Sequence, residues 1–153
     1  MSAMDLGSFL LETGIWFRFV EKSETVHTSD AAKAAGLPLE KVTKNLIAKT
    51  HRGEYVLLIV SGDNKVDLRK VAAILGVKSV GLVPFDRAEE VSGYPPGATP
   101  SVGHKTKMRV LMDESLLRFE TLFSGGGSRS KLVELRTADI RDLNQADVCD
   151  ITI

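Results

Sequence analysis

The segment from Gly93 to His104 carries the residue types best suited to holding a ligand with main-chain groups. It contains three glycines and three prolines in twelve residues. Proline lacks a backbone donor and glycine is costly to order, so the segment can continue neither a helix nor a central strand. Glycines allow backbone N–H groups to approach a ligand closely. The segment is predicted to be either a binding loop or a rigid crossover between two halves of the fold.

Lys44 is the cation that could act together with this loop. It stands where a short helical turn after Pro38 gives way to an apolar strand, so its stem could be covered and its ammonium turned into a pocket. There it could anchor a phosphate or stabilise a developing oxyanion, beside backbone donors from the loop and from the later glycine run 124–128. The competing interpretation is a solvated surface lysine, with Lys41 and Lys49 as its neighbours.

Two nucleotide-binding motifs are matched only in part. A Walker A loop ending at Gly103 would need a glycine at Ala98 and a lysine at His104. The run Gly125–Gly127 begins a Gly-x-Gly pattern, but Ser130 occupies the position of the third glycine and no Rossmann unit surrounds it. Neither motif predicts a nucleotide cofactor.

Metal, disulfide and serine-nucleophile chemistry receive no support from the residue spacing. His27, His51 and His104 are far apart and lack helical i, i+3 or i, i+4 partners, so no metal site and no cofactor are predicted. The single Cys149 excludes an internal disulfide and a multi-cysteine metal site, and it fits a reducing cytoplasm. The chain has no Gly-x-Ser-x-Gly elbow.

The composition predicts a soluble cytoplasmic protein that forms one domain over residues 1–153. Hydrophobic residues make up 43% and charged residues 26%, and twenty basic residues balance twenty acidic ones. A general basic field for nucleic acid is therefore not expected, although a local basic rim remains open. No apolar stretch is long enough to cross a membrane, so no membrane partner is expected.

The elements that must position these residues follow from hydrophobic periodicity and end signals. Helices are expected over 5–13, 67–76 and 86–93, from a cap at Thr28 or Ser29 to Gly36, and from a cap at Thr137. Strands are expected at 16–20, 45–48, 55–60, 77–83, 108–112, 117–123, 132–135 and 148–153. The apolar run 55–60 is predicted at the sheet centre, and Trp16 is interpreted as a core residue or pocket wall. This order predicts an α+β fold around a mixed sheet.

Several of these segments together resemble the YbaK/ProX family of aminoacyl-tRNA deacylases, which are similar to the editing domain of bacterial prolyl-tRNA synthetases. The matching stretches are Lys44-Asn45-Leu46-Ile47, 62–68, 93–104, 113–116 and the glycine run from Ser124. Their order and spacing match over residues 14–153. The resemblance implies a single editing-type domain with a mixed, mostly antiparallel sheet and flanking helices.

The resemblance also implies an activity and a site. The activity is hydrolysis of the ester that joins a wrong, small amino acid to the 3′-terminal adenosine of a tRNA, with an aminoacyl-tRNA synthetase as a further partner. Lys44, Gly97 and Ala98 fall on catalytic positions, the lysine fixing the substrate electrostatically and the pair holding the aminoacyl carbonyl. The implied substrate-binding residues are Thr99, Gly103, His104, Ser124, Gly125, Gly126 and Trp16.

Two positions depart from the family pattern, and both bear on the substrate. Ala98 replaces a second glycine, so its methyl group is expected to narrow the pocket or shift the backbone donors. Leu132 lies near a position where some members carry an aspartate, which weakens the case for a cysteine-specific role. Alanine, serine, threonine and cysteine remain open as substrates. A non-catalytic module that binds an oligonucleotide or tRNA end is the alternative function, and the oligomeric state is not predicted.

Overall fold

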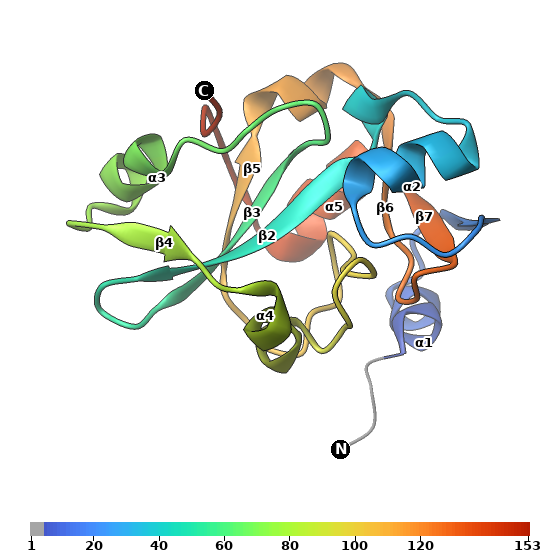
Figure 1. Cartoon of the computed structure of the whole chain (residues 1–153), viewed down its shortest axis with the longest axis horizontal. Coiled ribbons are helices and arrows are strands. Elements are labelled where there is room, and N and C mark those ends of the chain that lie inside the picture. Colours follow the sequence, from blue (N-terminus) through green and yellow to red (C-terminus); the bar gives the residue numbers. More distant parts are fainter. Residues whose placement is uncertain (1–4) are drawn as a thin grey trace.

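The computed structural model describes residues 5–153 and has an α+β architecture with two β-sheets (Figure 1). Five α-helices occupy α1 Leu6–Thr13, α2 Thr28–Ala35, α3 Leu68–Leu75, α4 Phe85–Ser92 and α5 Thr137–Asn144, with short 3₁₀ turns at η1 Leu39–Lys41 and η2 Glu114–Arg118. The strands are β1 Phe17–Glu21, β2 Thr43–Thr50, β3 Tyr55–Ser61, β4 Val80–Leu82, β5 Arg109–Asp113, β6 Thr121–Gly125, β7 Lys131–Arg136 and β8 Asp147–Cys149. In the described part, no helix is long and apolar enough to cross a membrane.

The larger sheet has the strand order β4-β2-β3-β5-β8, which confirms the apolar run of β3 as its centre. The β2–β3 and β2–β4 pairs are antiparallel, whereas β5 runs parallel to both β3 and β8. The smaller sheet, β1-β7-β6, is entirely antiparallel. The mixed, mostly antiparallel character is therefore confirmed, but the strands form two sheets. A bridge between Phe123 in β6 and Val42, the residue immediately before β2, links the two sheets.

Helix boundaries agree closely with the sequence, while some caps do not. Asp5 and Asp67 cap α1 and α3 through their carboxylates, as acceptors of first-turn N–H groups. The N-cap of α2 is His27 rather than Thr28 or Ser29. Helix α5 begins at Thr137 itself, whose hydroxyl donates instead to the carbonyl of Phe119 at 2.6 Å. Thr28, Ser29 and Thr137 lie inside their helices. The residues before the helices, His27 and Arg136, already have the extended backbone of an N-cap.

The region expected as a strand over 117–123 is divided in the structure. Asp113 accepts from the N–H of Ser115 and so starts the 3₁₀ turn η2, which delays β6 until Thr121. Ser124 and Gly125, expected in a glycine loop, are the last residues of that strand. The strand therefore carries the start of the second glycine segment directly into the sheet.

Helix α2 packs its alanine face against the smaller sheet. Ala31 and Ala32 are buried in one cluster with Val42, Phe123 and Leu132. Small side chains allow the helix to approach the strands closely, and Figure 1 shows it lying over β6 and β7. The start of α2 is consequently held beside the first residues of β2 and the last residues of β6.

The C-terminal segment closes the outer edge of the larger sheet. Ile151 receives a hydrogen bond at its carbonyl from the N–H of Asp67 (2.7 Å), and its own N–H donates to the carboxylate of Asp113 (3.0 Å). Cys149 lies in β8 and is partly buried; burial is the main cause that raises the pKa of its thiol, with Asp147 adding to it. The segment thereby connects α3 to β5.

Candidate functional site

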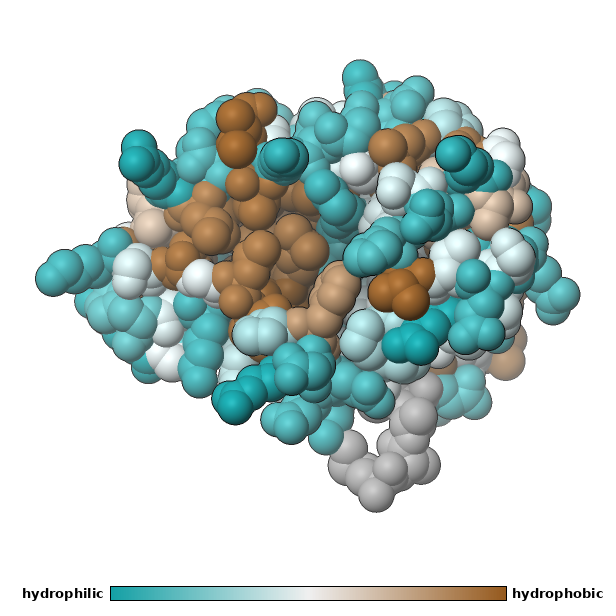
Figure 2. All heavy atoms as spheres, in the orientation of Figure 1, coloured by the Kyte–Doolittle hydropathy of each residue, from teal (hydrophilic) through white to brown (hydrophobic). Residues whose placement is uncertain are grey.

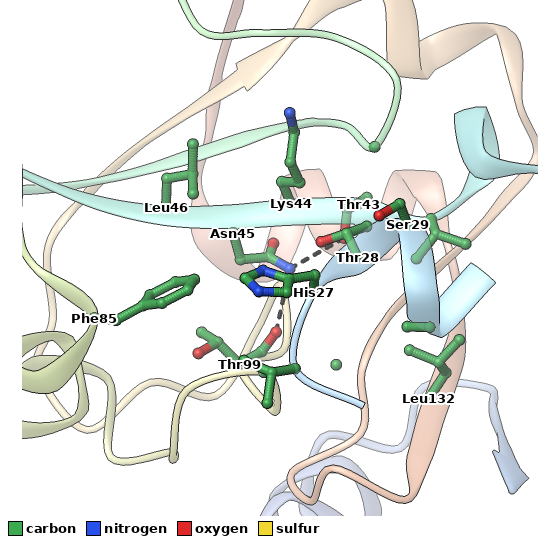
Figure 3. Close-up of a pocket in the computed structure, with 16 residues that line it drawn as sticks. His27, Thr28, Ser29, Thr43, Lys44, Asn45, Leu46, Phe85, Thr99 and Leu132 are labelled. Carbon is green, nitrogen blue, oxygen red and sulfur yellow. Dashed lines mark hydrogen bonds between the residues drawn. The ribbon is translucent and has the colours of Figure 1, made fainter. Parts of the chain in front are cut away.

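A cavity of about 300 Å³ opens between the start of α2, strand β2 and the two glycine segments (Figure 3). Its wall combines hydroxyl, amide and imidazole groups with apolar side chains. It is lined by Val26, His27, Thr28, Ser29, Ala31, Val42, Thr43, Lys44, Asn45, Leu46, Gly62, Phe85, Gly97, Thr99, Gly125 and Leu132. Four of the predicted residues, Lys44, Gly97, Thr99 and Gly125, are therefore brought together.

The two glycine segments touch each other through their backbones. The N–H of Gly127 donates to the carbonyl of Ala98 at 3.0 Å, and the side chain of Arg129 donates to that of Pro96 at 2.8 Å. A β-carbon on Gly125 would collide with the main chain of Ala98 and Thr99. Only glycine permits this contact, so the backbone itself closes the cavity floor.

Gly97 serves the same purpose on the side of α2. Its φ is +85°, a backbone conformation that residues other than glycine rarely adopt. An added β-carbon would also stand 2.7 Å from the Cα of Val26. The glycine thereby lets the loop pack against the segment that leads into α2. Glycine at position 97 is therefore explained by its backbone conformation and by its contact with Val26.

Asn45 occupies the centre of a polar network beneath the cavity. Its Nδ2 donates to the carbonyl of Thr99 (3.2 Å) and to the hydroxyl of Thr43 (3.1 Å), while its Oδ1 accepts from the hydroxyl of Ser101 (2.6 Å). The N–H of Ser101 in turn donates to the hydroxyl of Ser124 (3.3 Å). The network fixes the glycine loop to both β2 and β6.

Lys44 lies at one rim of the cavity and not at its floor. Side chains alternate along β2, so Lys44 extends to the opposite side of the strand from Asn45 (Figure 3). Its ammonium donates to the main-chain carbonyl of Asn64, in the turn after β3. Burial lowers the pKa of Lys44, and the nearby carboxylate of Asp63 opposes this effect. The cation is held against the protein, on the other side of β2 from the glycine floor.

Three predicted site residues support the cavity without lining it. Ala98 and Ser124 have no exposed surface, and the N–H of Gly126 donates to the carbonyl of Lys131. Of the two effects expected of the Ala98 methyl group, narrowing of the pocket is not seen, because this fully buried side chain is not among the groups that line the cavity.

Gly103 and His104 anchor the other end of the loop. The hydroxyl of the buried Tyr94 donates to the carbonyl of Gly103 at 2.8 Å, and Nε2 of His104 lies 2.7 Å from the carbonyl of Pro100. Burial lowers the pKa of His104, which keeps its ring neutral at pH 7 with Nε2–H as the donor. Both residues shape the loop at a distance from the cavity.

The interpretation of Trp16 as a core residue or pocket wall is wrong. Its side chain is 39% exposed and does not line the cavity. The guanidinium of Arg136 lies 5.6 Å from the centroid of its ring, a cation–π distance. Trp16 immediately precedes β1, which is an edge strand of the smaller sheet.

His27, Thr43 and Phe85 belong to the lining but were not among the residues predicted from sequence. Spacing gave no signal for them, because they come from three separate elements. Leu132, noted only as a departure from a family pattern, contributes an apolar wall and is 3% exposed. Over residues 5–153, no three His, Cys, Asp or Glu side chains gather to hold a metal ion.

A second, more apolar cavity of about 230 Å³ adjoins the first. It shares Asn45, Leu46, Phe85 and Thr99 with the first cavity and is otherwise lined by Ile47, Leu82, Val83, Ala88, Tyr94 and Pro96. Figure 2 shows apolar side chains gathered over β2 and β4 in this part of the face. The two cavities together form a polar region beside an apolar one.

A family model described as the aminoacyl-tRNA editing domain matches residues 22–143, a range that includes every residue lining the cavity. The chain belongs to the aminoacyl-tRNA editing domain family. The resemblance noted from the sequence is thereby confirmed.

Two of three similar proteins carry names that refer to tRNA. The multifunctional Ser/Thr-tRNA deacylase ProXp-y of Escherichia coli (strain K12) is 26% identical over 92% of this chain and 87% of its own length. The uncharacterized protein YwhH of Bacillus subtilis (strain 168) is 30% identical over 86% of this chain and 84% of its own. A crystal structure of a candidate trans-editing enzyme for prolyl tRNA synthetase is 28% identical, with a TM-score of 0.80 over 90% of this chain and 87% of that one.

Proposed function

We propose that this protein is a free-standing deacylase that hydrolyses the ester bond of a tRNA mischarged with a small amino acid. One observation carries the proposal: the cavity is closed by backbone contacts between the Gly97–Thr99 and Gly125–Gly127 segments. A floor made of main chain lets a bound carbonyl approach the backbone without intervening side chains. Membership of the editing-domain family supports the same activity.

Ester hydrolysis at this site requires few protein groups. An aminoacyl ester is already activated, so a positioned water or the neighbouring ribose hydroxyl is a sufficient nucleophile. The glycine segments would hold the carbonyl and stabilise the tetrahedral oxyanion, and loss of one such donor typically costs a hundredfold to a thousandfold in rate, on the order of 3 to 4 kcal/mol. Thr43 and Asn45 keep this floor in place.

Lys44 serves as an electrostatic anchor in this mechanism. Because its ammonium lies on the opposite side of β2 from the glycine floor, it suits a phosphate of the tRNA end better than the ester carbonyl. An ammonium attracts a phosphate as a point charge. The contact with the Asn64 carbonyl pre-positions the cation at the rim.

The size of the cavity favours a small amino acid. Ala31, Val42 and Leu132 form an apolar side, and the hydroxyl of Thr43 and the amide of Asn45 form a polar side. A single methylene changes binding by only about 1 to 3 kcal/mol, so a pocket of this kind separates large from small side chains better than small ones from each other. Alanine, serine, threonine and cysteine are the amino acids to test.

A panel of mischarged tRNAs tests the function and the role of Lys44 together. We expect wild-type protein to release at least one of these four amino acids, and Lys44→Ala to lose most of that activity while keeping the wild-type circular dichroism spectrum. Lys49→Ala is the matched control, because Lys49 is exposed on the same strand, outside the cavity. Wild-type rates in Lys44→Ala would refute the role of the lysine.

The alternative function, a non-catalytic module that binds a tRNA end, predicts a different outcome. Binding that weakens steeply with salt, without release of any amino acid across the whole panel, would replace the deacylase proposal.

A further inference from the structure

Two aromatic rings lie side by side at the mouth of the cavity. The ring centroids of His27 and Phe85 are 6.4 Å apart and their planes are inclined by 35°. Both residues line the cavity, and Figure 3 shows their rings on either side of an open gap.

Packing does not account for the position of either ring. Phe85 is 53% exposed, and His27 is exposed as well. Each is fixed at a helix start, with His27 as the N-cap of α2 and Phe85 as the first residue of α4 after Pro84. Two exposed rings held at rigid positions beside a cavity are suited to a ligand rather than to the core.

The exposed ring faces suit a planar guest. A guest sandwiched between two rings needs roughly 7 Å between them, from two van der Waals contacts of about 3.5 Å, and the His27 and Phe85 centroids are closer than that. A flat group can instead stack on the open faces of the neighbouring rings. A small aliphatic amino acid has no planar group for such a surface, whereas a nucleobase does.

We propose that the terminal adenine of the tRNA stacks on the exposed rings of His27 and Phe85, which together act as an aromatic clamp at the mouth of the cavity. This inference rests on the proposed deacylase function and names the groups that recognise the nucleoside. The start of α2 supports it, because no side chain caps the helix and its first residues, Thr28 and Ser29, line the same cavity. The N–H groups there are suited to the phosphate that precedes the adenosine.

The test uses an RNA minihelix that ends in 2-aminopurine riboside and carries alanine or serine through a non-hydrolysable amide. Stacking quenches the fluorescence of 2-aminopurine, so wild-type protein should bind the minihelix and darken its terminal base. Phe85→Leu and His27→Ala should each weaken binding by about five- to a hundredfold and abolish the quenching. Phe85→Tyr should restore both. Leu117→Ala is the control, because Leu117 is 44% exposed and lies outside the cavity.

The results separate the clamp from the hydrolysis. Wild-type affinity and full quenching in both Phe85→Leu and His27→Ala would overturn the clamp. Deacylation of mischarged tRNA by a wild-type protein that leaves the terminal base unquenched would overturn the clamp alone. A wild-type protein that neither binds the minihelix nor hydrolyses any mischarged tRNA would overturn the clamp and the proposed function together.

Discussion

At the scale of single residues, the side chain of Asn45 holds the floor of the cavity together through hydrogen bonds. Its amide connects Thr43, Thr99 and Ser101, and within residues 5–153 no buried side-chain nitrogen or oxygen lacks a hydrogen-bond partner. Removing one member of such a network leaves polar partners unsatisfied, which costs more than the net value of a hydrogen bond.

We therefore predict that Asn45→Ala lowers the free energy of unfolding by about 1 to 3 kcal/mol and reduces deacylation more than tenfold. Chemical denaturation and the tRNA panel measure the two effects. Asn64→Ala is the matched control, because only the main-chain carbonyl of Asn64 contacts Lys44. Equal stability of the two variants would show that the network does not hold the floor.

The sequence could identify Lys44 as a cation near a pocket, but not the direction of its ammonium. That direction depends on the register of β2 against β3, where Lys44 pairs with Val60 and Asn45 with Ile59. A shift by one residue would exchange the two faces of the strand. Such a register is set by contacts with distant residues, which no local pattern contains.

At the scale of elements, the contact between β6 and the glycine loop depends on Gly125. In Gly125→Ala the added methyl group would collide with the carbonyl groups of Ala98 and Thr99. We expect a loss of about 1 to 3 kcal/mol in the free energy of unfolding, together with loss of deacylation as the loop is displaced.

Gly81→Ala is the control for that prediction, since a β-carbon at Gly81 in β4 meets no atom within 4 Å. It should be neutral or stabilise the protein by up to about 1 kcal/mol. Comparable melting temperatures for the two variants would contradict the close contact at Gly125.

Elements with strong local sequence signals were predictable, whereas features that depend on contacts between distant segments were not. The apolar run of β3 and the helix from Asp67 to Gly76 follow directly from composition and end signals. The 3₁₀ turn η2 replaces part of an expected strand because Asp113 caps it locally. The cavity between α2 and the glycine segments could not be predicted, since it joins elements far apart in the chain.

At the scale of the whole molecule, the glycine loop is tied to the main core through Tyr94. Tyr94 is 1% exposed and packs in the cluster that includes Leu10, Ile59 and Leu122. Burial raises its pKa to about 12 from an ordinary value of 10.0. Because the folded protein holds the phenol neutral, stability from this group is complete below pH 10 and is lost as the pH rises through 12.

Tyr94→Phe tests this linkage. At pH 7 we expect it to lower the free energy of unfolding by about 1 kcal/mol, through loss of the hydrogen bond to Gly103. At pH 11 the difference should shrink or reverse, because only the wild-type unfolded state gains from ionisation of the phenol. Urea denaturation at both pH values measures it, and a constant difference would rule out the linkage.

The α+β class was predictable from the mixed order of strands and helices, but the division into two sheets was not. The two sheets are linked through the Val42–Phe123 bridge instead of a continuous ladder. The alanine face of α2 packs over this junction, and such a contact between distant segments leaves no local pattern in the sequence.

The partly buried Cys149 has a practical consequence for spectroscopy. Its raised pKa keeps the sulfur protonated at neutral pH, and maleimide dyes react with thiolates. A second cysteine introduced at an exposed position of α2 outside the cavity, such as Ala34, should therefore accept a fluorophore selectively. Single-molecule recordings of the α2 end during substrate encounter become feasible without first deleting the native sulfur.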